Sequence, residues 1–105
     1  MSWYLVIRRM QETPDGWKDL VEDHLTWMRS LHEDGSVIMS GPSTDLRLGI
    51  YVMRAQDASK ARAVALRDPL LRSGGASVEI IEWQLHQVLG VGVFEENALD
   101  LRLAD

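Results

Sequence analysis

The sequence contains no cysteine among its 105 residues. Disulfide bonds, thiolate nucleophiles and thiolate metal ligands are therefore excluded, and one sign of secretion is missing. Long apolar runs are missing as well. The apolar N-terminal segment, residues 3–7, is far shorter than a signal-peptide core or a membrane span, and its charges, Arg8 and Arg9, come after the run. We therefore expect a cytoplasmic protein that does not enter a membrane.

Clusters of basic residues are also missing. The 11 Lys and Arg residues are scattered, 16 Asp and Glu residues outnumber them, and the formal net charge is -5. Proteins that bind nucleic acid or anionic membranes concentrate positive charge on one surface, so we expect neither partner. With 46% hydrophobic residues, the chain has enough apolar material for the core of one compact domain.

Motifs for cofactors, metals and nucleophilic serine are missing too. Gly90-Val91-Gly92 is too short for a phosphate-binding loop, and there is no Gly-x-Ser-x-Gly elbow. His24 and His32 lie about 80° apart around a helix axis, which does not favour a shared metal ion. We therefore expect neither a cofactor nor a metal, and the remaining candidate chemistry is a histidine paired with a carboxylate.

Residues 17–35 form the one long segment with a clear helical period. At about 100° per residue, its apolar side chains fall on one stripe: Trp17, Leu20, Val21, Trp27, Met28 and Leu31. His24 lies in the middle of this stripe and is predicted to point inward. Thr13 and Pro14 are the expected N-cap and first-turn residues, and Gly35 is the expected end of the helix.

The remaining elements are predicted as four strands and a second helix. The predicted strands cover residues 3–9, 37–40, 46–54 and 77–85, with a turn over 41–45. The second helix covers residues 58–68 with Asp57 as N-cap, Asp68 on its inward stripe and Pro69 closing it. The order βαββαβ is typical of a ferredoxin-like α+β fold, in which two helices cover one face of a four-stranded antiparallel sheet.

The first and last predicted strands are apolar on both faces, so the sheet face opposite the helices also needs a cover. A second copy of the same sheet is the simplest cover, and it predicts a homodimer of the dimeric α+β barrel type. We expect residues 1–88 to form the domain. Residues 89–105 form a C-terminal tail that either crosses to the partner or caps an edge of the sheet.

His24 and Asp68 are the candidate catalytic residues, and each has a structural alternative. His24 as a core histidine would bond a backbone carbonyl. Asp68 as a cap would start a short turn at Pro69, a role compatible with catalysis. Trp27 and Met28, on the same stripe as His24, are most simply core residues; the alternative is that they line a substrate cavity.

Taken in order, His24, Gly35, Gly41-Pro42, Asp68-Pro69 and the strand of residues 78–83 resemble the pattern of the YciI-like (YCII-related) family. The similarity covers residues 2–88. It implies a dimeric α+β barrel of the wider group that includes muconolactone isomerase, with a histidine–aspartate active-site dyad that maps onto His24 and Asp68. Most family members have no assigned substrate, so the resemblance implies a site but no particular reaction.

A histidine held by a carboxylate in an apolar cleft is suited to proton transfer. We therefore expect a small-molecule enzyme that isomerises a small ring or lactone-like substrate or eliminates a leaving group from it. Gly41 and Pro42 would let backbone amides approach a developing oxyanion. The alternative is a non-catalytic dimeric module that binds a ligand or a protein partner. The enzyme requires a cavity that reaches His24 and Asp68, whereas the binding module does not.

Overall fold

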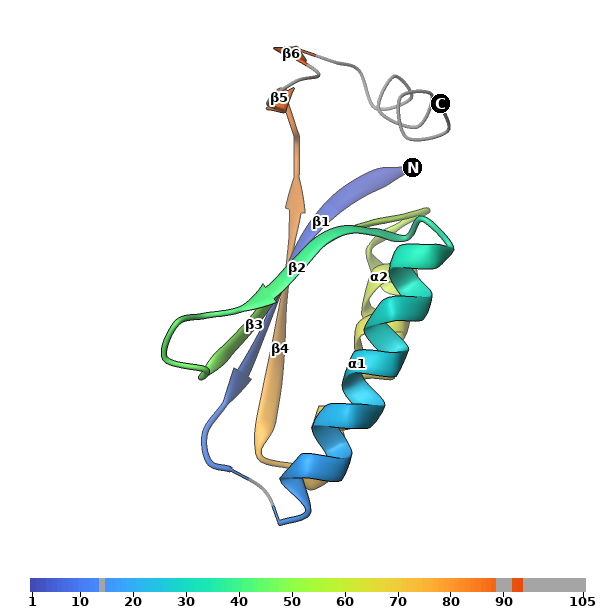
Figure 1. Cartoon of the computed structure of the whole chain (residues 1–105). Coiled ribbons are helices and arrows are strands. Elements are labelled where there is room, and N and C mark those ends of the chain that lie inside the picture. Colours follow the sequence, from blue (N-terminus) through green and yellow to red (C-terminus); the bar gives the residue numbers. More distant parts are fainter. Residues whose placement is uncertain (14, 89–91, 94–105) are drawn as a thin grey trace.

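A computed structural model describes residues 1–13, 15–88 and 92–93 of the chain (Figure 1). Its elements are β1 (Ser2–Met10), α1 (Trp17–Glu33), β2 (Val37–Pro42), β3 (Leu48–Ala55), α2 (Ala58–Ala65), the 3-10 helix η1 (Pro69–Ser73), β4 (Ala76–Trp83), β5 (Gln87–Val88) and β6 (Gly92–Val93). In the described part of the chain, no helix is long and apolar enough to cross a membrane.

The four long strands form one antiparallel sheet in the order β2-β3-β1-β4, while β5 and β6 pair with each other. Both α-helices lie on the same face of this sheet (Figure 1). The central strand β1 pairs with β3 on one side and β4 on the other, so that Val6 lies opposite both Tyr51 and Ile80. This arrangement is the predicted ferredoxin-like α+β fold.

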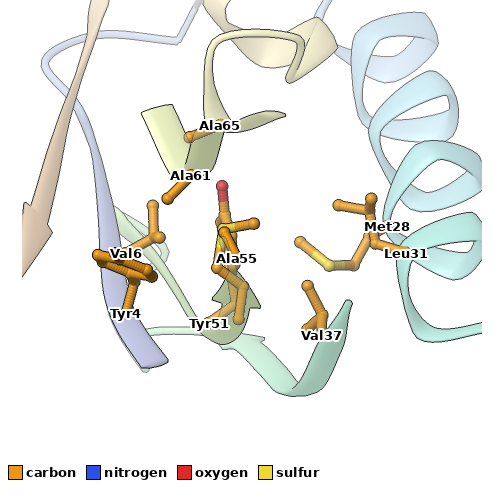
Figure 2. Close-up of a cluster of buried hydrophobic side chains, with 10 residues drawn as sticks. Tyr4, Val6, Met28, Leu31, Val37, Tyr51, Ala55, Ala61 and Ala65 are labelled. Carbon is orange, nitrogen blue, oxygen red and sulfur yellow. The ribbon is translucent and has the colours of Figure 1, made fainter. Parts of the chain in front are cut away.

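The main core lies between the sheet and the two helices (Figure 2). The buried side chains of this core are Tyr4, Val6, Met28, Leu31, Val37, Tyr51, Met53, Ala55, Ala61 and Ala65. Ala61 and Ala65 are completely buried, and their small side chains let α2 pack closely on the sheet. Alternate residues of β1 point into this core because successive side chains of a strand face opposite sides.

Helix α1 ends as predicted but begins differently. Gly35, at φ 81°, donates to the carbonyl of His32, and Ser36 donates to the carbonyl of Leu31, which is the Schellman arrangement of a glycine-terminated helix. At the start, the prediction of a Thr13–Pro14 cap was wrong. The cap is Gly16, at φ 70°, because the chain enters the helix through a left-handed turn that glycine adopts without strain.

Several other boundaries differ from the prediction, among them the end of β4, which is Trp83 rather than 85. Helix α2 has the predicted Asp57 cap but ends at Ala65, because a residue before proline avoids the helical conformation and Asp68, with ψ 121°, precedes Pro69. Strand β2 continues through Pro42, which is tolerated because β2 is an edge strand of the sheet. Strand β3 begins at Leu48 rather than 46, since Leu46 has φ 64° in the preceding turn.

The sheet face opposite the helices carries a second apolar cluster, the open-face cluster, defined by Trp3 and Val52 with Leu5, Ile38 and Leu85 packed against them. Ile81 and Trp83 of β4 lie opposite Leu5 and Trp3 of β1, and their side chains are 41% and 43% exposed. Strands β1 and β4 are thus apolar on both faces, as the sequence indicated. The predicted tail, residues 89–105, lies outside the described residues except for Gly92–Val93.

Candidate active site

Asp68 is placed by the junction between α2 and η1. Its Oδ1 accepts a hydrogen bond from the backbone N–H of Leu70 at 3.0 Å, so it caps the 3-10 helix that begins at Pro69. The residue is only 3% exposed. A buried carboxylate requires several donors to replace the water that it has lost, and two further donors reach Asp68 from elements distant in the sequence.

The first of these donors is His24, from the middle of α1. Its Nδ1 lies 2.8 Å from Oδ1 of Asp68. An ionised carboxylate only accepts hydrogen bonds, so Nδ1 must carry the proton and donate. In the neutral imidazole, Nε2 is then the unprotonated nitrogen, and within the described part of the chain no group forms a hydrogen bond with it. The capping and histidine-binding roles considered for Asp68 therefore occur together.

The second donor is Arg8 of β1, which the sequence reasoning missed. Its Nη1 donates to Oδ2 of Asp68 at 3.0 Å, and the side chains are 8% and 1% exposed. Tyr4 and Val6 of the same strand face the helices, and a period of two places Arg8 with them. This alternation is the sequence signal that could have identified Arg8, but its partner lies 60 residues further along the chain.

These neighbours set the ionisation of the site. Burial raises the pKa of Asp68, but the hydrogen bond and charge of His24, the N–H of Leu70 and the charge of Arg8 together outweigh burial, so the pKa lies below its ordinary value of 3.8. Burial, and then the negative charge of Asp68, raise the pKa of Tyr51. At neutral pH the site therefore holds a carboxylate, a guanidinium and a protonated phenol.

A cavity of about 360 Å³ opens beside these groups, between α1 and the β2–β3 hairpin. Its polar contributors are Arg8, His24, Ser40 and Tyr51, and its other lining residues are Trp17, Val21, Leu25, Met28, Gly41, Pro42, Leu46, Gly49, Ile50 and Leu70. Asp68 does not line the cavity but bonds two residues that do. The cavity therefore reaches His24 but not Asp68, so the expected cavity lined by both residues is found only in part.

The residues predicted to bind substrate are distributed unequally around this cavity. Met28, Gly41 and Pro42 line it, whereas Trp27 does not. The ring of Trp27 instead packs beside His24, with ring centroids 5.8 Å apart, and meets Tyr51 edge-on at 6.2 Å. The ring of Trp27 therefore packs against the side of the imidazole.

Other hollows of the surface lack comparable chemistry. Two of about 680 and 740 Å³ lie near the start of α1, and every residue that lines them is exposed or half-buried. Among the residues that the structure describes, no group of three or more His, Asp or Glu side chains lies close enough together to hold a metal ion. The cavity beside His24 is therefore the candidate active site.

The fold and this site define a ferredoxin-like α+β domain with a histidine–aspartate pair at an apolar cavity. The chain belongs to the YCII-related domain family, whose sequence model matches residues 1–84, in agreement with the resemblance noted from the sequence. The protein YjpA of Bacillus subtilis (strain 168) is 32% identical over 65 residues, which cover 62% of this chain and 76% of YjpA.

A solved structure has a similar fold. It is 5-chloro-2-hydroxyhydroquinone dehydrochlorinase (TftG) from Burkholderia phenoliruptrix AC1100, in complex with 2,5-dihydroxybenzoquinone. The TM-score is 0.66 at 16% sequence identity, and the match covers 78% of this chain and 93% of that chain. At this identity the similarity concerns the fold.

Proposed function

We propose that this chain is a small-molecule enzyme in which His24, held by Asp68, moves a proton on a small ring substrate. The observation that carries the proposal is a histidine whose Nδ1 is fixed by a buried carboxylate 2.8 Å away and whose Nε2 forms no hydrogen bond with the described residues. A core histidine normally has its polar atoms satisfied by protein groups. His24 instead lines an apolar cavity, which favours the catalytic role.

The reaction that this geometry supports needs no other catalyst. Neutral His24 accepts a proton at Nε2 from a C–H or O–H bond of the substrate, and the electron pair left behind forms a new double bond. Return of the proton to a different atom completes an isomerisation. Departure of a leaving group with its electron pair completes an elimination. Asp68 stabilises the imidazolium that forms in either case, as the carboxylate does in a Ser-His-Asp triad.

The size of the cavity and the structural neighbour narrow the reaction class. About 360 Å³ is near the lower end of the range for ligand pockets, which suits a substrate with a single ring. The neighbour is named as a dehydrochlorinase and was solved with 2,5-dihydroxybenzoquinone. We therefore favour elimination from a hydroxylated ring over isomerisation of a lactone.

The test begins with a thermal-shift screen of lactones and of substituted quinols and phenols, since a ligand that binds only the folded state raises the melting temperature. Compounds that bind are then incubated in D2O and followed by NMR for deuterium incorporation or release of the leaving group. We expect His24→Asn to abolish the reaction and His86→Asn, at an exposed histidine, to leave it unchanged. Equal rates in both variants would show that His24 is not the base. Binding without reaction would favour the non-catalytic module.

We further propose that two copies associate through the open-face cluster, which gives the dimeric α+β barrel that the family resemblance implies. A surface with Ile81 41% and Trp83 43% exposed beside buried Trp3 is apolar enough to mark an interface. Light scattering should therefore give twice the 11.9 kDa mass of one chain. Ile81→Glu should weaken the dimer, whereas Leu66→Glu, at an exposed position after α2, should not. A wild-type monomer contradicts this assembly.

A further inference from the structure

Arg8 is a buried cation with more hydrogen-bond donors than the described residues of the protein use. The residue is 7% exposed, and a guanidinium carries five N–H bonds. The bond from Nη1 to Asp68 is the one hydrogen bond that its side chain forms with the described residues, and Nε is buried without an acceptor among them. Unused donors on a buried charge are costly, so their presence in a cavity wall calls for an explanation.

The local backbone is built to hold this guanidinium in the wall of the cavity. Gly49 lies directly opposite Arg8 in the pairing of β1 with β3. A Cβ at Gly49 would lie 2.5 Å from Cζ and 2.6 Å from Nη1 of Arg8. Because these distances are nearly equal, the flat face of the guanidinium lies over the backbone of Gly49. The Cβ of any other residue at this position would collide with the guanidinium. Both residues line the same cavity as His24.

We propose that Arg8 binds an oxygen of the substrate that carries or develops negative charge, so that the site is selective for single-ring acids such as phenols, enols and carboxylic acids. This inference rests on the proposed function, because it concerns the same cavity. It assigns the oxyanion-binding role to a side chain of β1 rather than to the backbone around Gly41 and Pro42.

The balance of charges supports this assignment. Asp68 and Arg8 carry opposite charges, and the reaction starts from the form of the site in which the Nε2 of His24 has no proton. Transfer of a proton from the substrate to Nε2 leaves an imidazolium and an anionic ring, and no atoms are gained or lost. The anion then lies beside Arg8 while the imidazolium lies beside Asp68, so each new charge meets a fixed charge of opposite sign. Such preorganised charges stabilise the charge-separated state, which is the main electrostatic route to a lower barrier.

The test compares benzoate with benzamide, which have the same shape but differ in charge. Calorimetry on the wild-type protein should show benzoate binding at least about tenfold more tightly, as expected for a charge-assisted hydrogen bond. Arg8→Met should remove this preference, and Arg8→Lys should retain part of it. Arg9→Met is the matched control, because the Arg9 side chain is exposed and pairs with Glu79. Its preference should match that of the wild-type protein.

Equal binding of the two probes by the wild-type protein, or a preference that survives Arg8→Met, would overturn the inference. If Arg8→Met does not fold, the double variant Arg8→Met with Asp68→Asn removes both charges of the buried pair and takes its place. His24→Asn separates this inference from the proposed reaction, since the benzoate preference should persist without the base. A preference lost in His24→Asn and kept in Arg8→Met would assign the anion to His24 instead.

Discussion

Replacing Asp68 by Asn should destabilise the fold strongly, although the two side chains are nearly the same size. Asn keeps the acceptor for the N–H of Leu70 but removes the charge that faces Arg8 at 3.0 Å and His24 at 2.8 Å. Breaking a buried ion pair by neutralising one partner costs about 3–5 kcal/mol, because the remaining charge is left without compensation. A domain of this size has a free energy of unfolding of about 5–15 kcal/mol, so the loss is a large fraction of the total.

Urea denaturation measures this loss as a lower midpoint at unchanged slope. Asp57→Asn is the matched control, since Asp57 also caps a helix but is exposed and lies outside the buried ion pair. Asn is an equally good cap, so the midpoint of this control should hardly move. Similar midpoints for the two variants would refute the argument. So would a double variant, Arg8→Met with Asp68→Asn, that is no more stable than Asp68→Asn alone.

The buried carboxylate of Asp68 should also make the free energy of unfolding depend on pH. Because the folded-state pKa of Asp68 lies below its ordinary value of 3.8, its contribution is fully present above that value and is lost as pH falls through the folded-state pKa. The difference in unfolding free energy between wild type and Asp68→Asn should therefore shrink as the pH falls below about 4. A difference that grows as the pH falls below about 4 would contradict the direction of the pKa shift.

Three further changes test the supporting structure. Gly49→Ala should cost about 1–3 kcal/mol through overpacking against Arg8, whereas Gly41→Ala, with nothing within 4 Å of its Cβ, should have little effect in the same urea assay. Gly35→Ala should cost about 1–2 kcal/mol because of its positive φ of 81°, and an unchanged midpoint would argue against the glycine-terminated helix. Removal of residues 89–105 should leave the circular dichroism spectrum of the domain intact and weaken the dimer in light scattering; an unaffected dimer would mean that the tail does not cross to the partner.

Local signals in the sequence were sufficient for much of the fold. The helical stripe around His24, the Asp57 cap and the terminating Gly35 each act within a few residues and have the predicted role, except that Trp17 at the start of the stripe is 39% exposed. The adjacent pair Asp68-Pro69 also indicated, without any distant residue, that Asp68 caps a short turn that begins at Pro69. Boundaries that depend on sheet position were missed, as at Pro42, where an edge strand tolerates a proline that an inner strand would reject.

Only part of the site could be predicted, because its charged residues come from a strand and from helical segments that are distant in the sequence. His24 points inward from the helical period of α1, as predicted. Asp68 is buried as the N-cap of η1 rather than on a stripe of α2, which ends at Ala65. Arg8 was missed because it follows the apolar residues of β1. Its pairing with Asp68 joins residues 60 positions apart in the sequence, so no local pattern indicates it. Trp27 shares the inward stripe of α1, and its ring packs against His24, Tyr51 and the core rather than lining the cavity, which fits the simpler expectation of a core residue.

The central claim is that Asp68 fixes His24 with the proton on Nδ1 and leaves Nε2 as the base. Long-range proton–nitrogen NMR of the imidazoles tests it most directly, at about pH 8, where an ordinary histidine is neutral. His24 should be wholly in the Nδ1–H form in the wild-type protein and become a mixture of tautomers in Asp68→Ala, which removes the oxygen that accepts from Nδ1, while the exposed His86 is the same in both. A wild-type His24 with its proton on Nε2, or a spectrum that Asp68→Ala leaves unchanged, would contradict the proposed function.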